Sequence, residues 1–315
     1  MNERQNSERS LPGTAVALPR VSHSGSLGRL ARYSTPYWYI APFFIIFFAF
    51  FAYPVIYSFY VSLHTWSGQG AMTWVGWDNY NFVLSDNYFM EALQVSGLMW
   101  LSVPFTTVLS LVIAVIWNHP RFWGRNVVLI LFLLPTVISI VAVSLVFRIL
   151  YDPTSGPIDA ILSWLHLPTF DWLNDENPAR AAIFIVRIWE TVGLGVLFFA
   201  SSLQAISQDL YDAAAVDGCG PIRGFFSLTV PLLARTILFL MVISTLSSLS
   251  LFAEPNLIES GGGPNNATVT IGVYLWLKVQ ALDLGTASAV SFLLTTIMMV
   301  ISVALFLIAR RWISD

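Results

Sequence analysis

Four residues with helical spacing stand inside one of the long apolar stretches of this chain. Arg187, Glu190, Thr191 and Leu194 follow positions i, i+3, i+4 and i+7, so they share one stripe of a helix. An arginine at the centre of a bilayer costs at least about 2.5 to 3.5 kcal/mol on insertion scales, so such a residue usually faces a cavity or a partner. We therefore expect this stripe to line a passage for a polar solute, with the guanidinium, carboxylate and hydroxyl groups contacting hydroxyls such as those of a sugar.

A second polar stripe follows in the next apolar stretch, where Ser244, Ser247 and Ser248 share a helix face and Glu254 stands at its outer end. We expect this stripe to line the same passage. Two structural roles could instead explain the polar residues of these two stripes. Arg187 and Glu190 can neutralise each other as an i, i+3 pair, and serines in membrane helices commonly allow two helices to pack closely.

The longest polar interruption in the second half of the chain runs from Asp209 to Pro231. Its three carboxylates, its alanine run Ala213–Ala215 and its later glycines predict a short helix, a break at 218–221 and a second short amphipathic segment. Alanines allow a helix to approach another protein surface closely, and Asp212 is favoured near the start of a helix, where it can pair with an arginine of a partner. This pattern indicates a docking element.

Composition defines the class of protein that carries these residues. The 315 residues are 56% hydrophobic and only 10% charged, whereas soluble domains carry about 25% charged residues. A net charge of -3 without a basic patch excludes nucleic acid as a partner. The single cysteine, Cys219, cannot form an internal disulfide, and no cluster of His and Cys suggests a metal site. The chain is predicted to be a polytopic membrane protein.

Six apolar stretches approach the roughly 20 residues needed to cross hydrocarbon, and they predict an all-α membrane domain over residues 37–315. Residues 1–36 are rich in Ser, Arg, Gly and Pro and are expected to form a mobile tail. Prolines within or near the spans, Pro54, Pro104 and Pro135, are expected to mark kinks. The expected spans are about 37–63, 93–117, 127–147, 181–203, 233–252 and 287–308.

The arginines orient these spans. Six spans place both termini on one side, and the connections on that side hold most of the arginine, including Arg121, Arg125, Arg223 and Arg310, whereas the loop 64–92 has no Lys or Arg. By the positive-inside rule, both termini and the loop 205–232 are expected to be cytoplasmic.

Three sequence motifs resemble those of bacterial carbohydrate importers of the ATP-binding-cassette (ABC) class, in particular the MalF-like and UgpA-like permeases. The cytoplasmic loop is similar to the EAA motif of that family, E-A-A, three residues, Gly, nine residues, I-x-L-P. Aspartate replaces the glutamate, which keeps the charge but shortens the side chain by one methylene. The matching residues are Asp212, Ala213, Ala214, Gly218 and Pro231, with Leu228 and Val230 at the Ile and Leu positions.

Two further motifs lie in loops predicted to face outward. Residues 74–80, WVGWDNY, are similar to the W-x-G-aromatic-x-N-Y segment of the family. The run Gly261-Gly262-Gly263-Pro264, followed by Thr268, is similar to its GGP-x-x-x-T segment. Each motif alone is weak. Their order among the six predicted spans, over most of residues 37–310, identifies the chain as a member of this family.

The resemblance implies a fold, partners and a location. It implies a type I ABC importer permease fold with six transmembrane helices and a cytoplasmic coupling helix, in a prokaryotic inner membrane. It also implies a second related permease subunit, two copies of a cytoplasmic ATPase subunit and an external solute-binding protein or lipoprotein. Because this chain has no G-x-x-x-x-G-K-[ST] loop, no cofactor is expected in it, and ATP and Mg²⁺ would be bound by the ATPase subunits.

Three alternatives stay open at this point. An importer of glycerol phosphate or glycerophosphodiesters would use Arg187 as an anion partner, and competition binding at its solute-binding protein would separate the two cargoes. An intramembrane enzyme would need reactive pairs within the spans, but the four histidines fall in the tail, at a span end or in loops. A channel-like receptor would conduct without an ATPase.

Overall fold

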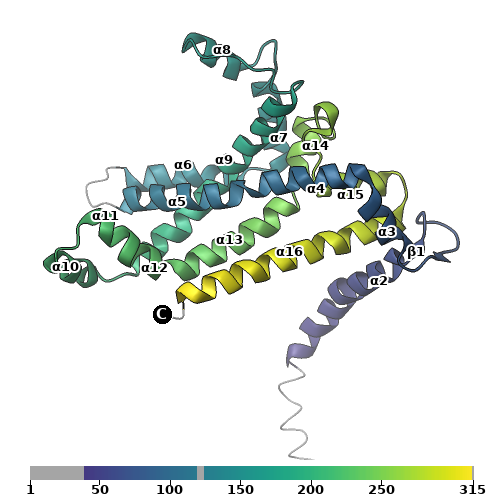
Figure 1. Ribbon diagram of the computed structural model, residues 1–315, viewed down its shortest axis with the longest axis horizontal. Helices are drawn as coiled ribbons and strands as arrows, with labels where there is room; N and C mark the ends of the chain where they lie inside the picture. The colour runs from purple at the N-terminus through teal and green to yellow at the C-terminus, as the bar shows by residue number, and fades with distance from the viewer. Residues whose placement is uncertain (1–38, 119–123, 314–315) are drawn as a thin grey trace, which may run out of the picture. The chain divides into compact units, whose positions relative to one another are not determined.

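The computed structural model describes residues 39–118 and 124–313, and these are almost entirely helical (Figure 1). Five helices of these residues are long and apolar enough to cross a membrane, and a bent pair of helices would make a sixth span if its two halves were counted as one. The all-α class is therefore confirmed, while the count of six spans stays a prediction. The predicted tail lies outside the described residues. The five spans are Tyr39–Ser62, Asn87–Asn118, Glu176–Gln204, Ala234–Ile258 and Leu284–Arg310.

The first span contains a local widening before Pro54. A π-helical turn, η1 (Phe48–Ala52), leads directly into α2 (Tyr53–Ser62). A proline ring clashes with the carbonyl four residues earlier and offers no N–H to the helix, and a π turn accommodates such a defect. Pro54 thus widens this helix locally. By contacts between its residues the chain divides after Ile56 into two compact units.

A small hairpin follows the first span and contains the W-x-G-aromatic-x-N-Y motif. Strands β1 (His64–Thr65) and β2 (Thr73–Trp74) pair antiparallel, with His64 opposite Trp74. In helix α3 (Asp78–Ser85), the Asn79 amide donates to the carbonyls of Ser62 and His64 at 2.8 and 2.9 Å, and the Tyr80 hydroxyl lies 2.8 Å from Ser62 Oγ. The motif residues Asn79 and Tyr80 hold the hairpin against the end of the first span.

The second span is interrupted near Pro104. Helix α4 (Asn87–Trp100) ends at Leu101, and α5 (Ser102–Asn118) continues the span. Because Pro104 has no N–H for the carbonyl of Trp100, the regular hydrogen bonding fails at this position. The predicted irregularity is therefore present as an interruption at Leu101.

The third predicted span is sharply bent. Helices α6 (Arg125–Val137) and α7 (Ile140–Leu150) meet at 100°. Pro135 lies in the last turn of α6, and Ile138 and Ser139 adopt extended backbone conformations (ψ 142° and 130°). The kink expected from Pro135 is thus a complete break in the helix.

Helix α9 (Glu176–Gln204) is the central element of the bundle and packs against both α5 and α6. Small residues permit these contacts. A Cβ on Gly195 would lie 2.4 Å from Ser110 Oγ, and that hydroxyl donates to the Val192 carbonyl at 2.9 Å. Gly193 faces the backbone of Phe132 so closely that no side chain fits. Close approach through small residues is typical of helix pairs in membranes.

Helix α16 packs against α13 and α15, whereas α14 packs against α7 (Figure 1). A buried cluster around Tyr274 includes Phe89 and Val290 and joins α4, α15 and α16. The Tyr274 hydroxyl donates to Asp86 at 2.6 Å. The bounds of these helices are α13 (Ala234–Leu249), α14 (Ala253–Ile258), α15 (Ile271–Gln280) and α16 (Leu284–Ile313). The remaining helices are α8 (Pro157–Trp164), α10 (Gln208–Val216), α11 (Pro221–Gly224), α12 (Val230–Leu232), the π-helix η2 (Phe225–Thr229) and the 3-10 helix η3 (Pro264–Asn266).

Candidate functional site

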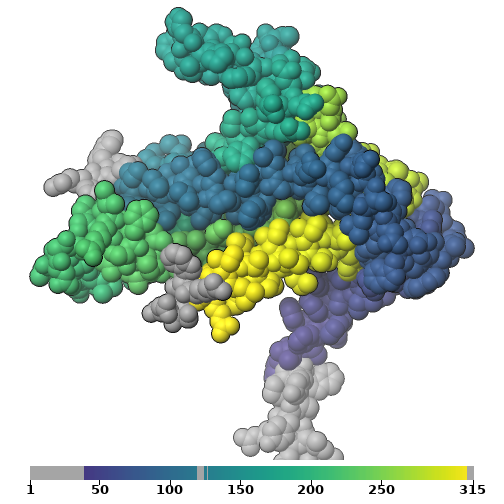
Figure 2. Space-filling view, in the orientation of Figure 1, coloured from purple at the N-terminus to yellow at the C-terminus, as the bar shows by residue number. Residues whose placement is uncertain are grey.

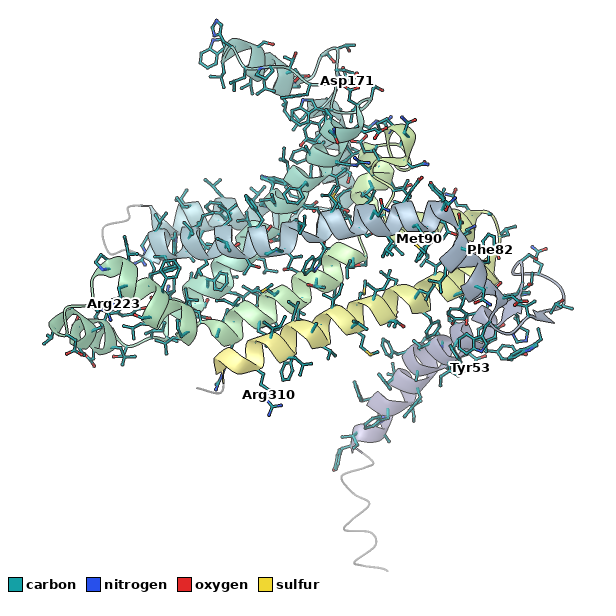
Figure 3. All side chains as sticks on the ribbon, in the orientation of Figure 1. Tyr53, Phe82, Met90, Asp171, Arg223 and Arg310 are labelled. Carbon is teal, nitrogen blue, oxygen red and sulfur yellow. The ribbon has the colours of Figure 1, made fainter. Side chains whose placement is uncertain are left out.

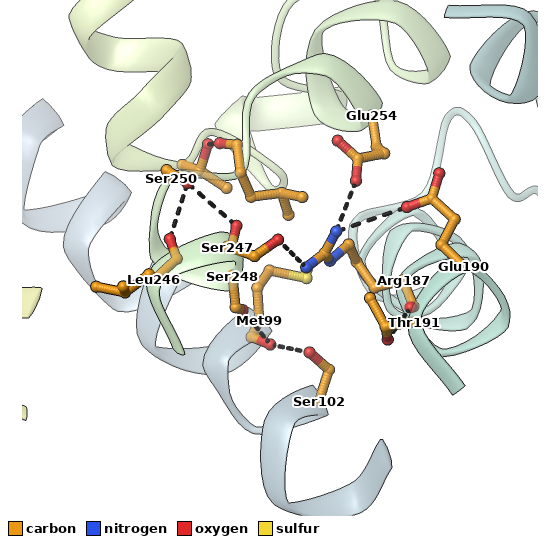
Figure 4. A network of polar contacts seen from close by, with 12 residues as sticks. Met99, Ser102, Arg187, Glu190, Thr191, Leu246, Ser247, Ser248, Ser250 and Glu254 are labelled. Carbon is orange, nitrogen blue, oxygen red and sulfur yellow. Dashed lines mark hydrogen bonds and ion pairs between the residues drawn. The ribbon is translucent and has the colours of Figure 1, made fainter. Parts of the chain in front are cut away.

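The first predicted stripe forms a buried charge cluster between α9, α13 and α14 (Figure 4). Arg187 Nη1 lies 3.3 Å from Glu254 Oε1 and 3.6 Å from Glu190 Oε2, and Nη2 donates to Ser247 Oγ at 3.0 Å. Arg187, Glu190 and Glu254 are 7%, 9% and 3% exposed, whereas Ser247 is exposed. One guanidinium is thus held between two carboxylates, and Ser247 is the member that reaches the surface.

Two polar atoms of this charge cluster have no hydrogen-bond partner in the described part of the chain. They are Arg187 Nε and Glu190 Oε1, one donor and one acceptor. Unpaired polar atoms at this depth are costly. A ligand hydroxyl can satisfy both, because it accepts from the guanidinium and donates to the carboxylate.

Glu254 was predicted only to lie at the outer end of the serine stripe, and its contact with Arg187 was missed. The two residues are 67 positions apart in the chain, so no helical spacing reveals the pair. The general tendency of intramembrane charges to pair with one another was the available clue.

Of the other residues predicted for the passage, two donate hydrogen bonds to backbone carbonyls and two are exposed or half-buried. The Thr191 hydroxyl donates to the Arg187 carbonyl at 2.6 Å, and the buried Ser248 hydroxyl donates to the Met99 carbonyl at 3.1 Å. Leu194 is 40% exposed, and Ser244 is half-buried. The structure therefore brings Arg187, Glu190 and Ser247 together, while Ser248 joins α13 to α4, as the helix-packing explanation requires.

The predicted docking element forms a helix, a turn and a second helical segment on the surface of the bundle (Figure 2). Helix α10 is capped by Ser207, whose hydroxyl accepts from the Asp209 N–H at 3.3 Å, and it has no buried residue. It ends before Gly218, whose φ of +78° is one that glycine adopts readily. The short helix and the break at Gly218 both agree with the sequence prediction.

The residues of the EAA-like motif lie mainly on the exposed side of this segment. Asp212, Ala213, Gly218 and Pro231 are exposed, while Ala214 and Leu228 are half-buried. Among the described residues, the Asp212 carboxylate accepts one hydrogen bond, from Gln208 Nε2 of its own helix at 3.2 Å. Its carboxylate is therefore open to a partner.

A cavity of about 570 Å³ lies under α10. The Tyr211 hydroxyl crosses from α10 to Thr229 Oγ1 of η2 at 3.1 Å and connects the exposed helix to the bundle. The cavity is lined mainly by apolar groups, among them Val115, Leu203, Tyr211, Cys219, Phe225 and Thr229.

In the described residues, no group of three or more His, Cys, Asp or Glu side chains gathers in a way that could hold a metal ion. The polar groups inside the helices are a charge cluster and scattered hydroxyls. Together with the apolar helices, they are typical of an integral membrane protein that contains a buried polar cluster.

Comparison with known proteins identifies the family. Residues 106–314 match the family described as the binding-protein-dependent transport system inner membrane component. The chain belongs to this family: it is a multi-pass permease of the ABC transporter class, a transport protein and not an enzyme.

Two relatives and one solved structure illustrate the match. The chain is 32% identical to the sulfoquinovosyl glycerol transport system permease protein SmoG of Agrobacterium fabrum, over 82% of this chain and 84% of that protein. It is also 32% identical to the trehalose/maltose transport system permease protein MalF of Thermococcus litoralis, over 82% of this chain and 87% of that protein. The same fold is found in a chain of the crystal structure of a bacterial alginate ABC transporter in complex with an alginate pentasaccharide-bound periplasmic protein. The TM-score is 0.73 and the sequence identity is 23%, and the match covers 91% of this chain and 98% of that chain.

Proposed function

We propose that this chain is the permease subunit of an ATP-driven importer for neutral carbohydrates. It forms half of the transmembrane passage together with a second, related permease. Two ATPase subunits bind on the cytoplasmic side, and a solute-binding protein or lipoprotein delivers the sugar from outside. The periplasmic protein in the alginate transporter complex supports the last of these partners.

The exposure of α10 is the observation that carries the coupling role. A helix that has no buried residue, in an otherwise apolar protein, leaves most of its surface free to contact another protein. Segment 205–232 is therefore proposed as the coupling loop, which transmits ATP binding and hydrolysis to the passage by alternating access. Asp212, Ala213, Ala214, Gly218, Leu228 and Pro231 are the proposed contact and turn residues.

The cytoplasmic placement of the coupling loop is proposed from the distribution of arginine. Arg223 and Arg310 lie toward the same end of α13 and α16, away from Phe82 and Met90 (Figure 3). Arginine-rich ends face the cytoplasm in membrane proteins. By the same rule, both termini are proposed to lie on the side of the ATPase subunits.

The charge cluster is proposed as the sugar-contacting part of the passage. Its unpaired donor and acceptor suit a hydroxyl group, and Ser247 connects the cluster to the surface. Leu194, Thr191, Ser244 and Ser248 would shape the passage around it. The motion between outward- and inward-facing states would expose the two buried atoms to the sugar.

The same charge cluster favours a neutral cargo over a phosphate ester. Arg187 is already bound by two carboxylates and a hydroxyl, so the group that would attract an anion is neutralised. An anionic sugar or glycerol phosphate would have to bind beside these two acidic groups. We therefore place neutral sugars ahead of glycerol phosphate.

Uptake by the reconstituted transporter tests the coupling role. We expect Asp212→Ala, and separately Gly218→Val, to lower ATP-driven sugar uptake at least about tenfold, because the first removes the exposed carboxylate and the second forces a β-branched residue into a positive φ. Asp217→Ala is the matched control, since Asp217 is also exposed but lies outside the motif positions. Uptake unchanged in both variants would contradict the proposal.

A further inference from the structure

An apolar groove of about 230 Å³ lies on the surface between α13 and α16. Ala234, Leu238 and Met241 line it from one face of α13. Leu305 and Ala309 line it from one face of α16. All of its lining residues have apolar side chains, and the transport function proposed above does not use this groove.

The groove opens away from the bundle and lies mainly within two membrane spans. Its lining residues are half-buried, such as Ala234 and Ala309, or exposed, such as Pro231 and Ile308. Most of them belong to the spans that begin at Ala234 and end at Arg310. Because the medium around a span is hydrocarbon, either a lipid acyl chain or an apolar helix can fill such a groove.

Two arginines flank the end of the groove that is nearest to segment 205–232. Arg235 directly follows Ala234 in the first turn of α13, and Arg310 directly follows Ala309 near the end of α16 (Figure 3). Both side chains are exposed. Because an arginine side chain is long and flexible, its guanidinium can reach a lipid head group beside the helix that carries it.

Neither of these two guanidinium groups is neutralised by the described part of the chain. Among the described residues, Arg235 and Arg310 form no ion pair. By contrast, Arg125, Arg180 and Arg187 each donate to a carbonyl or a hydroxyl of another segment. The two arginines beside the groove are therefore available to an external anion, and guanidinium groups bind phosphate with two parallel hydrogen bonds.

We propose that an anionic phospholipid occupies this site, with one acyl chain in the groove and its phosphate bound by Arg235 and Arg310. Basic sites between transmembrane helices bind anionic head groups in other membrane proteins. An apolar helix of another subunit would fill the groove but leave the arginines without a counter-ion. A zwitterionic lipid carries its own cation, which competes with the guanidinium groups for the phosphate. Of these three occupants, only the anionic phospholipid supplies both an apolar chain and an unneutralised phosphate.

The bound lipid would connect segment 205–232 to α16. Val230 and Pro231 line the groove and belong to the end of this segment. A lipid that contacts them together with Leu305 and Ala309 would fasten the segment to the last span. The lipid composition of the membrane would then affect the stability of this end of the bundle.

Thermal unfolding of the full-length chain in lipid nanodiscs, with the subunits that copurify with it, tests this site. Melting is compared between nanodiscs of phosphatidylcholine and nanodiscs that also contain phosphatidylglycerol. We expect phosphatidylglycerol to raise the melting temperature by about 2 to 4 °C, because a ligand that binds only the folded state stabilises it. Native mass spectrometry should detect phosphatidylglycerol retained on the extracted protein.

Two kinds of variant separate the head-group contact from the acyl-chain contact. Arg235→Gln combined with Arg310→Gln removes the guanidinium groups, and Ala309→Leu fills the groove without changing a charge. Each should remove most of the phosphatidylglycerol effect and of the retained lipid. The matched controls are Arg223→Gln and Ala304→Leu, which change exposed residues that do not line the groove and should keep the effect.

Three outcomes would overturn the proposal. The first is equal melting in the two kinds of nanodisc. The second is a phosphatidylglycerol effect that is lost in the arginine variant but kept in Ala309→Leu, because attraction to the membrane surface without a seated acyl chain would then explain it. The third is reduced copurification of another subunit in Ala309→Leu with an unchanged phosphatidylglycerol effect, which would make the groove an interface between subunits.

Discussion

The charges of the cluster at Arg187 are buried, whereas the charges of the proposed coupling loop 205–232 are exposed. In the charge cluster, each charged group is buried and at least one of its atoms is paired within the chain. In the coupling loop, Asp212 and its neighbours are exposed and contact little beyond their own helix. The difference indicates which charges the fold itself needs and which it leaves to a partner.

This contrast follows from the cost of burying a charge. A charge removed from water must be paired, because an unpaired buried ion is strongly destabilising. A charge at the surface is solvated, so its loss hardly affects the fold. Substitutions in the charge cluster should therefore change stability, and substitutions in the coupling loop should change coupling.

Arg187→Gln should have the largest effect on stability. It leaves Glu190 and Glu254 buried side by side without a cation, which costs about 3 to 5 kcal/mol and should greatly lower the yield of folded protein in the membrane. Arg223→Gln in the coupling loop is the control and should leave the melting temperature unchanged. Combining Arg187→Gln with Glu254→Gln should recover part of the loss, and no recovery would mean that the two residues are not coupled.

Glu259 and Glu254 are both buried carboxyl groups, but they differ in their contacts. Glu254 pairs with Arg187, whereas neither oxygen of Glu259 has a hydrogen-bond partner among the described residues. Its pKa of about 8 lies above the ordinary value of 4.5, so the folded state binds this proton more tightly than the unfolded state. Its contribution to stability is complete below pH 4.5 and is lost as the pH rises toward 8, at no more than about 1.4 kcal/mol per pH unit. Melting measured from pH 5 to 8 in choline chloride should show this fall, and Glu259→Gln should remove it.

Ser248→Ala should have a smaller effect, of about 1 kcal/mol, because it removes the hydrogen bond to the buried Met99 carbonyl. Ser244→Ala is the matched control on the same helix, since Ser244 is half-buried and makes no comparable bond in the described structure. Denaturant unfolding of both variants distinguishes packing from pathway roles. Equal stability of the two would argue against a packing role for Ser248.

Tyr211→Phe should have the smallest effect on overall stability. It removes the contact between the Tyr211 hydroxyl and Thr229, and about 1 kcal/mol of local stabilisation corresponds to roughly fivefold faster amide exchange in α10. The melting temperature should stay unchanged because the contact lies outside the bundle core. Equally fast exchange throughout the bundle would contradict a local role.

Local features of the fold were predictable from the sequence. The alanine run gives α10, the break falls at Gly218, and irregular helix geometry occurs near each of the three prolines, because these effects act over a few residues. The 100° angle between α6 and α7 was not predictable, since Pro135 specifies a weak point but not the direction of the chain beyond it.

The site was predictable only in part, because the sequence shows contacts between nearby residues but not contacts between distant ones. The helical stripe of Arg187 and Glu190 is a local pattern, and the structure confirms that they lie together. Glu254 meets Arg187 only through the packing of α14 against α9. Thr191 and Ser248 turn their hydroxyls toward carbonyls, a rotamer choice that residue type does not determine.

The pairing in the charge cluster also limits how this protein can diverge. A change at Arg187 is tolerable only if a carboxylate is lost at about the same time, so the guanidinium and its acidic neighbours should be inherited together. The alanines of the exposed helix α10 have no such pairing within the chain, and their variation should instead follow that of the proposed ATPase partner. Sequence variation in this protein should thus show two patterns, one of covariation within the chain and one of covariation with a partner protein.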